Sequence, residues 1–329
     1  MRRNILALLV LAPFAATALA QPPGPAKPGL EFLGQGPVKL IVPFAAGGGV
    51  DTAARLIAKQ LQTDTGVPVI VDNRTGGSGV IGGRAVQMAA PDGQTLLFSA
   101  ATHVLTKLVL ANPPYDPQTD FTPVARVGEA PLLMVISPSL PQKKVGEVLD
   151  AMKREPDKWT AGLPALGAPS HIGTLLLAKQ GPVTLTTVAY KGTAPALTDV
   201  AGGHTQVLVD SIISLMPMVK AGKVKAIAVT SKKRTAIAPD VPTAAESGYP
   251  GLVHASWYGV WAPKGLAPAR QQALNKAFNA AVTELAKANA LAPLGIEPVT
   301  ESVEQFSKYV AEDVAKSADL LKTSGYSPQ

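Results

Sequence analysis

Twice within about fifty residues, a short apolar strand pattern runs into a glycine-rich turn that opens a helical pattern. The first copy joins residues 38–44 to the turn 45–49, and the second joins residues 67–71 to the turn 76–79. Glycines at such a junction let backbone N–H groups converge, and the start of the helix adds roughly half a positive charge. The repeated turn therefore predicts an α/β fold with a pocket for a small anion.

The chain begins with a pattern typical of an export signal. Arg2 and Arg3 precede an apolar stretch too short to span a bilayer, and an Ala-Leu-Ala cleavage motif follows it. We expect residues 1–20 to be a signal peptide and residues 21–37, rich in Pro and Gly, to be a flexible leader. The chain has no cysteine, which excludes a lipidated cysteine and disulfides. The pattern predicts a periplasmic protein.

Length and charge indicate the class of molecule and of partner. The chain has 329 residues, which fits two domains of moderate size. Its formal charge of +7 falls to about +5 without the two arginines of the signal (7 − 2), and the remaining basic residues are dispersed apart from residues 232–234. This balance favours anionic small molecules and argues against a nucleic-acid partner.

Strand and helix patterns alternate along the chain, which predicts mainly parallel sheets flanked by helices. The first four strand patterns are residues 38–44, 67–71, 95–99 and 132–136, and the middle of the chain continues in the same style. Two long helical patterns, residues 268–290 and 301–322, end the sequence. The second helix has a capping-box match at Ser302 and Gln305.

A set of ordered motifs covers nearly the whole chain after the leader. The motifs are Val42-Pro43-Phe44 with Gly47-Gly48, Asp72-Asn73-Arg74 with residues 76–82, residues 90–97 (Ala-Pro-Asp-Gly-Gln-Thr-Leu-Leu), Tyr190-Lys191-Gly192, Pro239-Asp240-Val241-Pro242-Thr243 and residues 256–263. In this order they resemble the Bug (TctC-like) family, the periplasmic solute-binding receptors of tripartite tricarboxylate transporters. The resemblance implies a two-domain periplasmic-binding-protein clamshell (type II, Venus flytrap). Each domain is then α/β, with a mainly parallel sheet flanked by helices and a carboxylated solute in the cleft.

The resemblance also implies that the chain crosses twice between the domains. We place domain 1 at residues 38–133 and 257–329, and domain 2 at residues 134–256. The crossings then fall near residues 133–137 and 256–260. Within the second crossing, Gly259 is the position where the backbone is expected to turn most freely.

Two facing loops form the predicted carboxylate site, because each offers a helix N-terminus to the cleft. The first is 44–51 in domain 1, and the second is 167–173 in domain 2, where Ser170 is the expected N-cap. The family's second loop usually carries a serine where this chain has Ala168. The predicted ligand-binding residues are Phe44, Ala46, Gly47, Gly48, Asp51, Ala168, Ser170, His171, Tyr190, Thr193 and Asp210.

Several residues in these loops and near them have a possible structural role as well as a possible functional one. His171 fits a ligand contact or a bond to backbone at the helix start. Asp210 fits a contact with the far end of a ligand or a cap for the following helix. Lys191 either lines the cleft or faces solvent. Arg74 either bonds within the second glycine turn, which we favour, or pairs with a dicarboxylate.

Enzyme signatures are weak or absent in the sequence. Residues 77–82 match the G-x-G-x-x-G dinucleotide fingerprint, but the strand pattern 95–99 is followed by no acidic residue for a ribose. There is no P-loop and no nucleophile elbow, and the four histidines are too far apart for a metal site. We therefore expect no catalytic constellation, no cofactor and no metal.

The sequence and the resemblance together predict an extracytoplasmic receptor that delivers a small carboxylate to transporter membrane subunits and works as a monomer. Tricarboxylates, amino-acid-like dicarboxylates and aromatic acids all fit the resemblance. Two alternatives remain open. One is an extracytoplasmic enzyme acting on a small organic acid, and the other is a ligand sensor for a two-component kinase.

Overall fold

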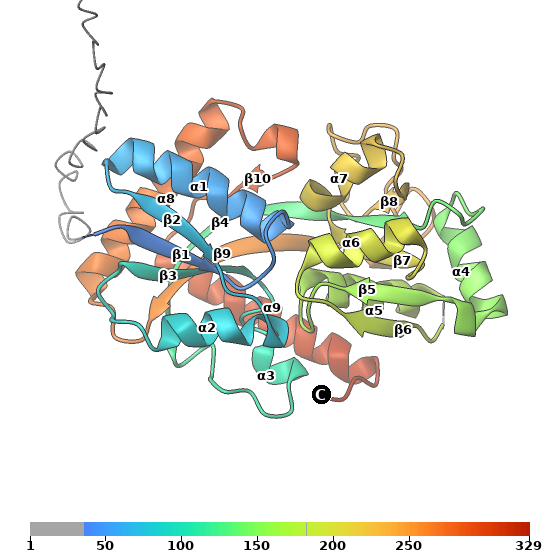
Figure 1. Ribbon diagram of the computed structural model, residues 1–329, viewed down its shortest axis with the longest axis horizontal. Coiled ribbons are helices and arrows are strands. Elements are labelled where there is room, and N and C mark those ends of the chain that lie inside the picture. The colour runs from blue at the N-terminus through green and yellow to red at the C-terminus, as the bar shows by residue number, and fades with distance from the viewer. Residues whose placement is uncertain (1–35, 182) are drawn as a thin grey trace, which may run out of the picture.

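One curled sheet runs through both halves of the molecule, with helices on its faces (Figure 1). This computed structural model describes residues 36–181 and 183–329. The predicted signal peptide, residues 1–20, and residues 21–35 of the predicted leader lie outside the described residues. The strand order along the sheet is β2-β1-β3-β9-β4-β7-β5-β6, and β10 and β8 each pair with β4 beside this path.

The first half contains both glycine-rich turns, residues 45–49 and 76–79. Its elements are β1 (Val38–Val42), α1 (Gly49–Thr65), β2 (Val69–Asn73), α2 (Val80–Gln87), β3 (Thr95–Ala100) and α3 (Thr106–Val109). Strand β1 pairs in parallel with β2 on one side and with β3 on the other. The predicted parallel pairing is therefore confirmed here, and both glycine turns lie at the carboxyl ends of parallel strands.

The second half repeats the alternation of strands and helices. Its elements are α4 (Val145–Arg154), β5 (Thr160–Leu163), α5 (Pro169–Gln180), β6 (Thr186–Ala189), α6 (Thr193–Gly202), β7 (Val207–Ser211), α7 (Ile212–Lys220) and β8 (Lys225–Val229). Strand β5 pairs in parallel with β6 and with β7. The two parallel sets lie at opposite ends of the sheet (Figure 1).

Two antiparallel strands, β4 (Phe121–Ile136) and β9 (Ala255–Pro263), join the halves. Residues 121–131 of β4 pair with β9, whereas residues 132–136 pair with β7 and β8. The partners of β4 thus change between Pro131 and Leu132, just ahead of the segment predicted for the first crossing. The sequence pattern did not predict these reversals of direction, because it shows only that strands alternate with helices.

Thr230, after β8, ties the two joining strands together. Its Oγ1 accepts a hydrogen bond from the Leu132 N–H at 2.9 Å and donates one to the His254 carbonyl at 2.5 Å. Its backbone carbonyl accepts from the His254 N–H at 3.2 Å. The chain therefore passes between the halves at two neighbouring points that one residue connects.

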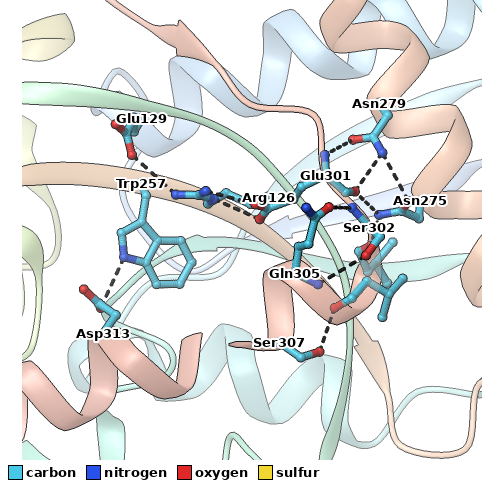
Figure 2. Close-up of polar contacts among 12 residues, drawn as sticks. Arg126, Glu129, Trp257, Asn275, Asn279, Glu301, Ser302, Gln305, Ser307 and Asp313 are labelled. Atoms are coloured by element: carbon cyan, nitrogen blue, oxygen red, sulfur yellow. Dashed lines mark hydrogen bonds and ion pairs between the residues drawn. The ribbon is translucent and has the colours of Figure 1, made fainter. Parts of the chain in front are cut away.

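Three elements end the chain: α8 (Pro268–Lys287), β10 (Glu297–Pro298) and α9 (Val303–Thr323). The predicted capping box is confirmed, because Ser302 Oγ accepts from the Gln305 N–H at 3.2 Å and Gln305 Oε1 accepts from the Ser302 N–H at 2.8 Å (Figure 2). These two bonds satisfy donors that a helix start otherwise leaves unpaired.

An ion pair fastens the residues before α9 to β4 (Figure 2). The Arg126 guanidinium bonds both carboxylate oxygens of Glu301 at 3.0 Å, and the amide groups of Asn275 and Asn279 donate to the Glu301 backbone carbonyl at 3.1 and 2.9 Å. Both charged side chains are largely buried. The two parallel N–H···O bonds make the ion pair bidentate, which strengthens it and fixes its geometry. This network joins β4, α8 and the start of α9.

Gly259, in the middle of β9, is a packing position. A Cβ at Gly259 would lie 2.6 Å from the Trp261 ring and 2.7 Å from the Phe306 ring. The expectation that the backbone turns most freely here is wrong, because Gly259 pairs with Ser99 of β3 and with Arg126 of β4 inside the sheet and packs against aromatic rings. The glycine makes room for buried aromatic rings between the sheet and α9.

Across residues 36–181 and 183–329, none of the helices combines the length and the apolar character needed to traverse a bilayer.

Candidate functional site

A pocket lies where the two halves meet, with about 390 Å³ of empty space when the part open to solvent is included. Its lining comes from the first glycine turn, from the ends of β3, β5 and β7, and from β9. The lining residues are Phe44, Gly48, Gly49, Val50, Ala100, Thr102, Pro164, Ala168, Pro169, Thr193, Asp210, Ser211, Ser256 and Tyr258. Small and apolar residues dominate, and a few polar groups face the same space.

Four helices begin at this pocket. Its lining includes Gly48 and Gly49 at the start of α1, Ala168 and Pro169 at the start of α5, Thr193 at the start of α6, and Ser211 as the N-cap of α7. At none of these four starts does a side chain cap the helix with a hydrogen bond. Each start leaves backbone donors and a partial positive charge, so their convergence favours an anion. Figure 1 shows α1 and α6 meeting from opposite halves.

Asp51 holds the first loop from behind and does not line the pocket. Its carboxylate accepts from the Gly47 N–H at 2.9 Å, from Arg55 Nε at 3.0 Å and from Asn73 Nδ2 at 2.9 Å. Burial opposes its ionisation, but these hydrogen bonds hold the pKa of Asp51 below its ordinary value. Asn73, the last residue of β2, also donates to the Phe44 carbonyl at 3.0 Å. The end of β2 thus braces the first glycine turn.

The second loop differs from prediction at its cap. Helix α5 begins at Pro169, so Ala168 is the N-cap and the assignment of this role to Ser170 is wrong. Proline at the first helical position explains the shift, because it lacks an N–H and is pre-set for the helix. The Ser170 hydroxyl is fully buried and has no hydrogen-bond partner within the described chain.

His171 bonds to its own loop. Its Nδ1 accepts from the Gly167 N–H at 3.1 Å, and its ring meets the Tyr326 ring edge-on at 4.9 Å. Burial lowers the pKa of His171 to about 4, so the ring is neutral at physiological pH. Of the two readings that the sequence left open, the backbone bond is the one present.

Asp210, at the end of β7, is buried in the pocket lining. Thr193 Oγ1 donates to its Oδ2 at 2.6 Å, which joins the start of α6 to β7. Burial raises the pKa of Asp210 to about 6, against the lowering effect of the bonds from Thr193 and from the Ser211 backbone. Beside it, the Ser211 and Tyr258 hydroxyls lie 2.9 Å apart.

The structure brings five of the predicted residues into the pocket lining and leaves the others around it. Those in the lining are Phe44, Gly48, Ala168, Thr193 and Asp210, and those outside it are Ala46, Gly47, Asp51, Ser170, His171 and Tyr190. Ala46 and Gly47 are exposed, and the Tyr190 hydroxyl donates to Asp199 at 2.6 Å. Lys191 is exposed, and Arg74 pairs with Asp72 of β2 at 2.9 Å, ahead of the second glycine turn.

Sequence reasoning missed several lining residues, of which Thr102, Ser256 and Tyr258 are polar. Thr102 is 2% exposed, and its hydroxyl has no hydrogen-bond partner among the described residues. Two signals could have located these residues. Thr102 follows the carboxyl end of a parallel strand, where ligands bind in open α/β sheets. Ser256 and Tyr258 alternate on one face of a strand in the predicted crossing.

The halves also touch directly beside the pocket. The Ala45 N–H donates to the Lys191 carbonyl at 3.1 Å, and the Leu166 N–H donates to Ser78 Oγ at 3.1 Å. A Cβ at Gly49 would lie 2.9 Å from Ser211 Oγ and 3.2 Å from the Tyr258 hydroxyl. Glycine at this position therefore allows α1 to approach the opposite half.

Comparison with known proteins places the fold among solute-binding receptors. The sequence profile of the "Tripartite tricarboxylate transporter family receptor" matches residues 53–326. The periplasmic binding protein BugD is 34% identical, and its structure superposes with a TM-score of 0.84 over 90% of this chain and 99% of BugD. The predicted two-domain clamshell of α/β domains is confirmed by this likeness.

Two similar structures contain bound carboxylates. Rpa4515 of R. palustris, solved with adipate, is 34% identical, with a TM-score of 0.86 over 90% of this chain and 99% of its own. MatC of Rhodopseudomonas palustris, solved with malate, is 32% identical, with a TM-score of 0.81 over 86% of this chain and 98% of its own. Adipate and malate are both small dicarboxylic acids.

Proposed function

The chain belongs to the tripartite tricarboxylate transporter receptor family, and we propose that it captures a small carboxylate in the pocket between its halves and delivers it to the membrane subunits of a transporter. The proposal includes a periplasmic location and action as a monomer. Its main support is the convergence of four helix N-termini on one pocket. Such an arrangement binds an anion through backbone donors and fixed dipoles, without a basic side chain.

The lining of the pocket supports a small, partly apolar ligand. Most of the lining residues are small or apolar, and a few polar side chains face the same space. The adipate of Rpa4515 and the malate of MatC give the chemical class, and we extend that class to this chain. We therefore expect a ligand with at least one carboxylate and a short, partly apolar body.

We assign the predicted site residues to two roles. Phe44, Gly48, Ala168, Thr193 and Asp210 would contact the ligand. Ala46, Gly47, Asp51, Ser170, His171 and Tyr190 would shape or brace the loops that carry these contacts. Thr102, with its unpartnered buried hydroxyl, joins the contact group. A buried hydroxyl without a partner gains most from a ligand that accepts its proton.

We further propose that residues 38–133 and 257–329 form domain 1 and that residues 134–256 form domain 2. The change in the partners of β4 between Pro131 and Leu132 supports a boundary near that point. The bonds of Thr230 to Leu132 and His254 would keep the two crossings together as the domains move.

Binding of carboxylates to the purified protein tests the function. In a thermal-shift screen of mono-, di- and tricarboxylic acids, a ligand of the folded state raises the melting temperature, because it adds about RT ln(1 + [L]/Kd) to stability. Calorimetry then gives the Kd of each acid that shifts the melting curve. A screen in which amines or sugars stabilise the protein and no carboxylate does would contradict the proposal.

Gly48→Val tests the location of the site. Its branched side chain would enter the space between the α1 start and Thr193, so we expect at least tenfold weaker carboxylate binding, about 1.4 kcal/mol. The backbone of Gly48 is extended, so valine fits it without strain. Ala286→Val, which places the same side chain on the exposed face of α8, is the matched control. Equal affinity in both variants, with normal melting curves, would remove this loop from the site.

Two further measurements separate the alternatives. Proton NMR of the ligand during long incubation with the protein distinguishes a receptor, which leaves the ligand intact, from an enzyme acting on a small organic acid. Uptake of the labelled ligand by cells that carry or lack the gene distinguishes delivery to a transporter from sensing for a two-component kinase. Turnover in the first experiment, or unchanged uptake in the second, would overturn the corresponding part of the proposal.

A further inference from the structure

The charge of the pocket is at odds with its proposed ligand. Among the lining residues, all of them described, there is no lysine, arginine or histidine, and Asp210 is the single acid. An ionised carboxylate here would repel the carboxylate that the four helix starts attract. Two carboxyl groups at hydrogen-bond distance cannot both be ionised at low cost, and they share one proton instead.

No basic side chain pairs with Asp210 among the described residues. Titratable groups on neighbouring elements are already engaged. From β9, the Tyr258 hydroxyl bonds Ser211, and burial raises the pKa of Tyr258 to about 12. Asp51 of α1 pairs with Arg55, and His171 of α5 accepts a hydrogen bond from the Gly167 N–H. Asp199 accepts a hydrogen bond from the Tyr190 hydroxyl. These groups therefore offer Asp210 no neutralising partner.

Burial shifts the ionisation of Asp210 towards its neutral form. The side chain is 6% exposed, and burial raises its pKa to about 6 despite two hydrogen bonds that favour ionisation. Thr193 occupies Oδ2, whereas pocket space lies beside the carboxyl group. A protonated carboxyl is both donor and acceptor, so it can accept from Thr193 and donate from its other oxygen.

This inference rests on the proposed function and specifies its chemistry. We propose that Asp210 is protonated when a carboxylate is bound and that its O–H donates to a ligand carboxylate oxygen. Capture of a carboxylate by protein whose Asp210 is ionised therefore brings one proton from solvent into the pocket. An O–H···O⁻ hydrogen bond is charge-assisted and stronger than a neutral one. Asp210 would thus select an acceptor at this end of the ligand and disfavour an ammonium group.

The pH dependence follows from the linkage of proton and ligand. In the free protein the pKa of Asp210 is about 6, and a bound carboxylate raises it further because it disfavours a second negative charge. Below about pH 6 Asp210 already holds its proton, so the association constant is flat there. Above that pH, binding must recruit the proton, and the association constant falls by up to about tenfold per pH unit until the pKa of the complex is reached.

Calorimetry with adipate and with malate tests this coupling directly. Titrations at about pH 6.5 and about pH 8.5 stay above the ordinary titration range of free carboxyl groups, so changes in the ligand contribute little. At the higher pH, repeating each titration in two carboxylate-free buffers of different ionisation enthalpy gives the number of protons taken up. We expect about one proton per ligand and an affinity loss of up to about 100-fold between the two pH values.

A matched pair of variants assigns the proton. Asp210→Asn keeps an acceptor for Thr193 and a donor for the ligand but cannot titrate, so it should bind with equal affinity at both pH values and take up no proton. Asp199→Asn removes an acid of the same half that does not line the pocket, and should keep the wild-type dependence. If Asp210→Asn does not fold, the proton count of the wild-type protein decides by itself.

The outcomes separate this inference from the function on which it rests. A carboxylate that binds without proton uptake and with constant affinity overturns the role of Asp210 and leaves the receptor function intact. An affinity that rises with pH, with preference for amino-dicarboxylates, overturns it in favour of an ionised Asp210 that holds an ammonium group. Failure of all carboxylates to bind at both pH values overturns both proposals.

Discussion

At the scale of single residues, His103 is a polar side chain buried in the core without a hydrogen-bond partner among the described residues. The side chain is 4% exposed and lies among the rings of Tyr115, Phe121 and Trp261, with ring centroids 4.4 to 5.7 Å away. Neither ring nitrogen has a hydrogen-bond partner among the described residues. Burial lowers the pKa of His103 to about 3, so the folded protein keeps this ring neutral.

His103→Leu should stabilise the protein, and more so in acid. At about pH 8 we expect a gain of about 1 kcal/mol in the free energy of unfolding, because two unpaired polar atoms leave the core. The folded pKa lies below the unfolded value of about 6.5. Wild-type stability is therefore lost as pH falls from about 6.5 towards 3, by up to about 1.4 kcal/mol per pH unit from this residue.

Urea unfolding of the two proteins at about pH 8 and about pH 5 measures both effects. His204→Leu, at an exposed histidine, is the control and should show neither gain. A His103→Leu protein whose advantage over wild type is the same at both pH values would contradict the assigned pKa.

At the scale of elements, two serines at helix starts are expected to behave in opposite ways. Ser302 caps α9 through a bond to the Gln305 N–H, so Ser302→Ala should cost about 1 kcal/mol of stability. Ser170 lies inside α5 with an unpartnered hydroxyl, so Ser170→Ala should leave the stability of the free protein unchanged or slightly higher. Chemical unfolding of both variants makes the comparison, and a loss of about 1 kcal/mol in Ser170→Ala would restore a capping role.

The start of α1 makes a second test at this scale. Alanine suits a helix better than glycine by roughly 0.5–1 kcal/mol. A Cβ at Gly49, however, would lie 2.9 Å from Ser211 Oγ on the opposite half. Gly49→Ala should therefore stabilise α1 and hold the halves apart, with at least tenfold weaker ligand binding.

Gly48→Ala is the control for this variant, because its Cβ meets the opposite half only at an ordinary 3.5 Å from Thr193 Oγ1. Small-angle scattering of both proteins reads out the separation of the halves. Equal radii of gyration in the two variants would show that the approach of α1 to Ser211 does not limit closure.

At the scale of the whole molecule, the halves meet through hydrogen bonds and through packed side chains such as the His171 and Tyr326 rings. The bonds from Ala45 to Lys191 and from Leu166 to Ser78 join the halves, and each such bond contributes about 0.5–1.5 kcal/mol net. A ligand held between helix starts of both halves would add contacts that exist only in the closed form. Ligand binding should therefore shift the population towards closure.

Small-angle scattering with and without a tightly bound carboxylate checks this expectation. We expect a smaller radius of gyration in the bound state, with Pro131–Leu132 and the segment before β9 absorbing the movement. Identical radii, with binding confirmed by calorimetry, would mean that the direct contacts already hold the cleft shut or that the site lies within one half.

What could be predicted from sequence is what neighbouring residues decide. The two glycine turns, the parallel strands on either side and the capping box at Ser302 follow from local backbone preferences. The ordered motifs identified the family, and with it the clamshell fold. Phe44, Gly48 and Thr193 line the pocket in connections where a strand is followed by a helix, so the local sequence pattern points to them.

The tertiary structure decided everything that depends on pairing and burial between distant segments. The reversed directions of β4 and β9, the packing role of Gly259 and the brace of Asp51 against Asn73 require contacts that no local pattern encodes. The burial of Asp210 beside Thr193 also depends on contacts between distant segments. Hydrophobic and hydrogen-bonding patterns specify local conformation, but the desolvation of a side chain depends on every element packed around it, and so only the assembled fold sets the chemistry of the pocket.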